Sequence, residues 1–233
     1  MISILSIIVS NIIIFILFII SLNKYLKKKT LSNLFWSFGF FETAISVLAF
    51  LLSIYTKNYF DFYIYYFLGA GLTPAILGLG AVYLLGKGKI QNYLFFSTLA
   101  LSLILIFLLL ISSFNIPNFN ALTLLIFKNI ITARDLNISL LGVNIINNGL
   151  WIIPLVILNT LGTIEILYVC IYSFYKDIKA HKITKRTIGV GLIALSVFIL
   201  AFVASVSRFY NVSIIWIGFM LTWIIFFSGY ILT

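Results

Sequence analysis

Two acidic residues, Glu42 and Glu165, lie inside long apolar stretches of the chain. A charged side chain at membrane depth is costly and marks a functional site by default, here one of proton or cation coupling. Both residues are expected at nearly the same depth, so their carboxyl groups would share a proton if they met. The structural alternative is a protonated glutamate that hydrogen-bonds a neighbouring helix, and the sequence leaves both interpretations open.

The residues around Glu42 form a small and polar face. Recurrence at intervals of three and four residues predicts that they share one side of a helix. Its members are Gly39, Glu42, Ser46, Ala49 and Ser53. Small residues let helices approach closely, so we expect this face to point into the bundle and the opposite face to meet lipid. The opposite face carries Phe40, Phe41, Val47, Leu48 and Leu51.

Two prolines inside apolar stretches predict helix kinks. Pro74 cannot donate a hydrogen bond to the carbonyl of Ala70, and Pro154 has the same effect in the stretch that contains Asn159 and Thr163. The freed carbonyls and these polar side chains could line a hydrated cavity. Alternatively, neighbouring side chains satisfy each kink.

Two further residues have open interpretations. Arg208 ends an apolar stretch, where its side chain either extends to the membrane surface or binds an anion at an outer vestibule. Trp223 lies in the middle of the last stretch, where it either faces lipid or forms the wall of an internal pocket.

The remaining reactive residue types exclude several chemistries. The only histidine, His181, lies in a predicted loop, so a haem held by paired imidazoles and a metal site of His and Cys are excluded. The only cysteine, Cys170, cannot form a disulfide within the chain. No lysine lies in the core of an apolar stretch to carry a retinal Schiff base, and no serine there has a histidine partner. We therefore expect neither an enzyme nor a cofactor.

The composition indicates which elements hold these residues. Hydrophobic residues make up 63% of the 233 positions and charged residues only 9%, whereas about a quarter of a soluble domain is charged. Seven stretches reach the roughly 20 residues that a membrane-spanning helix needs, and the polar alternation of strands is absent. The sequence predicts an all-α, seven-helix bundle in one transmembrane domain, 1–233. The spans are about 3–22, 33–55, 64–86, 92–113, 150–175, 188–207 and 214–232.

Basic residues predict the orientation. Most of the 15 Lys and Arg residues lie in three alternate loops, at 24–29, 87–89 and 176–186. Such loops face the cytoplasm, so the N-terminus is expected outside and the C-terminus inside, in the cell membrane. The net charge of +10 is then explained by topology and by anionic lipids at these loops, and nucleic acid is excluded as a partner.

The segment 114–149 is expected to be a long outer loop. Its apolar run 122–127 predicts an interfacial helix or a hairpin that caps the bundle. Asn137 and Asn211 begin Asn-x-Ser sequons, both on the expected outer face, so glycosylation is a hypothesis.

The order of the spans suggests an internal repeat of three helices, one linker helix and three helices. Asn11 and Asn159 lie in the middle of the first helix of each triplet, and Ser46 and Ser196 in the middle of the second. One intervening helix would give both triplets the same orientation, as in a parallel repeat.

Several segments together resemble a known pattern. They are Trp36 to Glu42, Tyr65 to Ala70, Leu77 to Leu85, Leu158 to Thr163, Leu192 to Ala194 and Gly218-Phe219. This set resembles an uncharacterised seven-helix family of prokaryotic membrane proteins. The resemblance implies the fold but no activity. Glu165 and Tyr168 occupy a run that holds small residues in that family, so the resemblance implies no role for Glu165.

Two functions remain from these patterns. The first is binding or transport of a small molecule or ion through a polar cavity inside the bundle, with Glu42 as its ionisable group. The alternative is a non-catalytic accessory or structural subunit of a larger complex, with a membrane-protein partner or a second copy of the chain. The apolar outer loop and the lack of a catalytic constellation favour that alternative.

Overall fold

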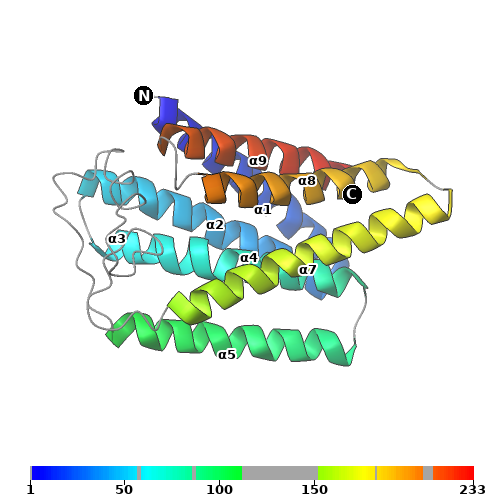
Figure 1. Cartoon of the computed structure of the whole chain (residues 1–233), viewed down its shortest axis with the longest axis horizontal. Coiled ribbons are helices and arrows are strands. Elements are labelled where there is room, and N and C mark those ends of the chain that lie inside the picture. Colours follow the sequence, from blue (N-terminus) through cyan, green and yellow to red (C-terminus); the bar gives the residue numbers. More distant parts are fainter. Residues whose placement is uncertain (1, 57–58, 86–87, 112–151, 182, 207–211) are drawn as a thin grey trace.

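The computed structural model describes residues 2–56, 59–85, 88–111, 152–181, 183–206 and 212–233, and all regular structure in these ranges is helical (Figure 1). The segment 114–149 with Asn137, predicted to be an outer loop, lies outside the described residues, as do Arg208 and Asn211. The elements are α1 (Ile2–Lys28), α2 (Leu31–Thr56), α3 (Tyr59–Ile64), the π-helix η1 (Tyr65–Leu72), α4 (Thr73–Val82), the 3-10 turn η2 (Tyr83–Leu85), α5 (Lys89–Ile111), α7 (Ile152–Lys179), α8 (Lys185–Val206) and α9 (Val212–Leu232).

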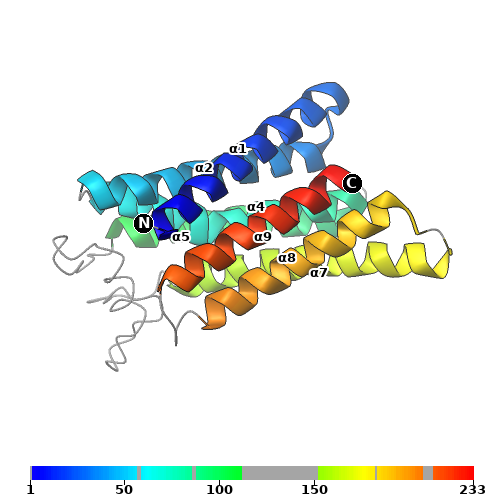
Figure 2. The same ribbon diagram turned by 90° about the horizontal axis from the view of Figure 1, so that it is seen from above.

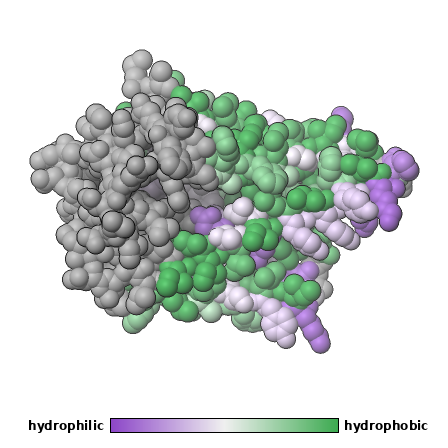
Figure 3. Space-filling view, viewed as in Figure 1, coloured by the Kyte–Doolittle hydropathy of each residue, from purple (hydrophilic) through white to green (hydrophobic). Residues whose placement is uncertain are grey.

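Among the described residues, six helical stretches are long and apolar enough to cross a membrane, and Trp216–Leu232 is a shorter apolar helix. Apolar side chains cover much of the visible flank, and hydrophilic ones gather at one end (Figure 3). Large side chains such as Phe107 and Leu110 are mostly exposed, which suits lipid but not water. The chain therefore has the structure of an all-α, multi-pass membrane protein.

Six helices form a closed ring. In order around it, α1 packs on α2, α2 on α4, α4 on α7, α7 on α8, α8 on α9, and α9 returns to α1. Figures 1 and 2 show the same helices side by side. Helix α5 lies outside this ring, against α4 and α7.

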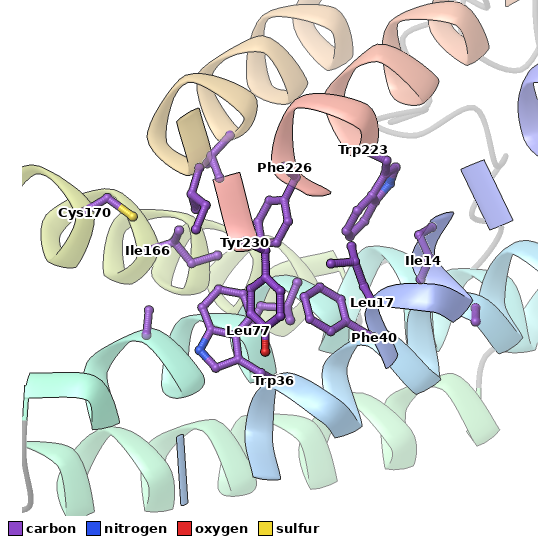
Figure 4. Close-up of a cluster of buried hydrophobic side chains, with 14 of the residues drawn as sticks. Ile14, Leu17, Trp36, Phe40, Leu77, Ile166, Cys170, Trp223, Phe226 and Tyr230 are labelled. Carbon is purple, nitrogen blue, oxygen red and sulfur yellow. The ribbon is translucent and has the colours of Figure 1, made fainter. Parts of the chain in front are cut away.

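Aromatic side chains fill the ring between α2 and α9. Phe40 is fully buried, and its ring centroid lies 5.5 Å from that of Tyr230 and 5.8 Å from that of Phe226. Trp36 and Trp223 complete this aromatic core (Figure 4). Trp223 is 4% exposed, so it does not face lipid.

The prediction that the bulky face of α2 meets lipid was wrong in part. Phe41 and Leu48 are exposed, but Phe40 and Val47 are buried. The physical reason is that α2 packs on α1 and α4 and reaches α9 through Phe40. Its buried surface is therefore wider than a single stripe of small residues.

Glycines set the closest contacts between ring helices. A Cβ added to Gly78 in α4 would lie 2.7 Å from the Cα of Gly162 in α7. Gly189 in α8 and Gly229 in α9 meet in the same way, because a Cβ on either would lie 2.6 Å from the carbonyl oxygen of the other. Small residues are what allows helix backbones in membranes to approach this closely.

Candidate functional site

Glu42 is buried inside the protein. Its side chain is 2% exposed, and neither carboxyl oxygen has a hydrogen-bond partner in the described part of the chain. The other residues of its small and polar face, Gly39, Ser46, Ala49 and Ser53, are also buried. Gly39 meets Leu77 of α4, so this face packs on the neighbouring helix.

The hydroxyl groups beside Glu42 bond elsewhere. Thr43 donates to the carbonyl oxygen of Gly39 at 2.5 Å and lies 3.1 Å from the hydroxyl of Thr73. Ser46 donates to the carbonyl oxygen of Tyr65 at 3.1 Å. These bonds join α2 to η1 and α4, and they leave the Glu42 carboxyl without a donor.

The predicted kink at Pro74 takes the form of a change in helix type. The π-helix η1 ends where Thr73 donates its backbone N–H to the carbonyl oxygen of Leu68, five residues earlier, and Pro74 lies in the first turn of α4. Proline is tolerated there because the first turn needs no N–H donor. Pro154 lies in the first described turn of α7, and the carbonyl that it would free lies outside the described residues.

Glu165 lies on α7, against the backbone of α4. Its side chain is 8% exposed, and Oε2 has no hydrogen-bond partner among the residues described. A Cβ on Gly78 would lie 2.5 Å from Oε2, so the missing side chain of that glycine makes room for the carboxyl. The Glu42 and Glu165 carboxyl groups are not hydrogen-bonded to each other.

The other predicted polar residues of α7 do not join Glu42. Thr163 donates its hydroxyl to the carbonyl oxygen of Asn159, one turn earlier in the same helix, at 2.8 Å. Both side chains are half-buried.

Sequence reasoning missed two buried polar residues on α5. Thr98 is 5% exposed and Ser102 is 9% exposed, on the side of α5 that also buries Leu105 and Leu109. The four-residue interval between Thr98 and Ser102 was the available signal, because it places both on one side of a helix.

Contacts at one end of α2 align it with α4 and α5. The ring of Phe35 lies 5.3 Å from that of Tyr83, which follows α4, and 5.9 Å from that of Phe95 on α5. Helices α2 and α5 run in the same direction (Figure 1). Glu42 lies seven residues after Phe35 on α2, and Ser102 lies seven residues after Phe95 on α5. At 1.5 Å per residue, each is about 10 Å further along its helix. The two residues are therefore at about the same height in the bundle.

Comparisons with protein-family models, with curated proteins and with solved structures gave no match for this chain. The resemblance to an uncharacterised seven-helix family is therefore not supported, and no family is identified. The fold and the two buried carboxyl groups carry the functional argument.

Proposed function

We propose that this membrane protein binds a proton or a small cation at Glu42 as part of a transport cycle, without catalysing a covalent reaction. The observation that carries the proposal is a fully buried carboxyl group for which the described residues offer no donor to either oxygen. Buried polar groups are nearly always hydrogen-bonded, and exceptions need an explanation. An intramembrane acid that binds a proton or cation provides one.

The structural alternative requires Glu42 to hydrogen-bond a neighbouring helix. Thr43 on α2 and Thr73 on α4 are buried side by side, and both donate to backbone carbonyls instead. A glutamate retained for packing would be expected to use at least one of them. The contacts of α2 therefore favour a binding role.

The proposed site lies on the side of α2 that packs on α4, where Gly39 meets Leu77. The aromatic core around Phe40 fills the ring toward α9, which argues against a polar path through the ring centre.

The proposal includes the orientation and the repeat. The basic loops support an outer N-terminus, a cytoplasmic C-terminus and a place in the cell membrane.

Duplication of a three-helix unit is supported by the ring, because each contact in α1–α2–α4 has a counterpart in α7–α8–α9. The contact of α4 with α7 corresponds to that of α9 with α1. Each triplet also begins with a hairpin that contains a residue of positive φ, Lys29 at 50° and His181 at 51°.

The test uses a hydrophobic carbodiimide, which reacts with protonated carboxyl groups inside membranes. Purified protein in liposomes is treated with the reagent, and the peptide that contains Glu42 is analysed by mass spectrometry. We expect an adduct on Glu42, protection by an alkali cation or by raised pH, and loss of the adduct in Glu42→Gln.

The functional readout is proton uptake into the same liposomes, driven by a potassium diffusion potential. Glu42→Gln should abolish uptake, and Asp177→Asn is the control, because it makes the same acid-to-amide change at a carboxyl group that already bonds Thr187. An unreactive Glu42 together with wild-type uptake in Glu42→Gln would refute the proposal. Stable co-purification with a second membrane protein in that case would favour the accessory-subunit alternative.

A further inference from the structure

The C-terminal part of α7 extends past the rest of the bundle (Figures 1 and 2). A shallow, open hollow lies along one face of this extension, beside Tyr172, Tyr175, Lys176, Lys179 and Ala180. All five side chains are exposed. The hollow is separate from the buried carboxyl groups, and the proposed function does not use it.

The hollow is basic. Lys176 and Lys179 both line it. The nearest acid along the helix, Asp177, accepts a hydrogen bond of 2.8 Å from the hydroxyl of Thr187 on α8. At 100° per residue, Asp177 lies well around the helix from the side that holds both lysines. The positive charge of the two ammonium groups is therefore uncompensated within the hollow.

The hollow is also amphipathic. Tyr172 stacks on Tyr168, with ring centroids 6.2 Å apart, and this aromatic pair continues from the hollow toward the middle of the span. Ile171 and Ile164 are exposed on the same part of α7. Tyrosines at the level of lipid headgroups combine an apolar ring with a polar hydroxyl.

We propose that this hollow binds an anionic phospholipid, with its phosphate between Lys176 and Lys179 and its acyl chain along Tyr168 and Ile164. Basic residues beside a membrane helix attract anionic headgroups. The exposed apolar side chains next to the lysines favour an amphipathic ligand over free phosphate.

The test measures lipid retained by the full-length protein in native mass spectrometry. Phosphatidylglycerol and phosphatidylcholine with identical acyl chains are supplied in separate samples. The wild type should retain phosphatidylglycerol preferentially. K176Q/K179Q should weaken that binding about 30-fold, because each lysine near the surface strengthens it about five- to sixfold.

The matched control is K27Q/K28Q at the end of α1, which removes the same charge from two exposed lysines outside the hollow. It should lower phosphatidylglycerol retention far less than K176Q/K179Q does, because these two lysines lie in another basic loop, outside the hollow. An equal loss in this control, equal retention of both lipids, or displacement of phosphatidylglycerol by inorganic phosphate would each overturn the proposal. All four lysines are exposed, so every variant should fold, and thermal unfolding checks this.

Discussion

The contact between α8 and α9 allows a sharp test of the fold with two alanine substitutions on one helix. Gly189 and Gly191 both lie in α8. An added Cβ at Gly189 would lie 2.6 Å from the backbone oxygen of Gly229, whereas at Gly191 it would lie 3.4 Å from the Phe174 ring. Backbone atoms cannot rotate away as a side chain can. Gly189→Ala therefore forces the helices apart, and Gly191→Ala makes an ordinary contact.

The two substitutions are expected to change the free energy of unfolding differently. Alanine is about 1 kcal/mol more favourable than glycine inside a helix, so Gly191→Ala should stabilise the protein slightly. Overpacking at Gly189 costs about 1–3 kcal/mol, which exceeds that gain or cancels it. Because both variants share the gain from alanine, they should differ by the overpacking cost alone, about 1–3 kcal/mol, or about 2–12 °C in Tm for a chain of this length.

The assay can use the chain's own reporter. Cys170 is the only cysteine in the sequence and is buried, so a thiol-reactive fluorogenic dye reports unfolding in detergent. Gly229→Ala should resemble Gly189→Ala, because the contact is reciprocal. Combining the two should give less than the sum of their effects, since the first substitution already forces the helices apart at the shared contact. Equal Tm values for Gly189→Ala and Gly191→Ala would refute the proposed α8–α9 packing.

Three other variants test separate parts of the structure. Phe40→Ala should destabilise the protein by about 3–5 kcal/mol because it empties the aromatic core, while Phe38→Ala, half-exposed on the same helix, should cost far less in the same melt. Glu42→Met should raise the Tm by removing two unpartnered buried oxygens, each worth about 1–3 kcal/mol, and a fall in Tm would show that Glu42 supports the fold. A cysteine at Lys27 should react with a membrane-impermeant maleimide only after cells are permeabilised, whereas labelling of intact cells would contradict the proposed orientation.

Hydropathy could predict the helices because a membrane span requires its residues to be apolar along its whole length. The burial of Glu42 followed from the small residues around it, because they mark where helices approach. The burial of Phe40 and Val47 could not be predicted, since lipid and protein interior are equally apolar and select the same side chains. The π-helix before Pro74 and the position of α5 outside the ring depend on which helices meet, and hydropathy carries little information about that.

The polar side chains of the bundle differ in how their hydrogen bonds can be satisfied. Ser10, Thr43 and Thr222 each donate a hydroxyl proton to a backbone carbonyl four residues earlier, so their own helix meets their requirement. An ionised carboxyl only accepts hydrogen bonds, and the backbone N–H donors around it are already used within the helix. Helix α2 therefore cannot satisfy Glu42, and the described part of its neighbours does not. An ionised Glu42 would therefore need a proton or a cation, which is why the proposal rests on this residue rather than on the hydroxyls around it.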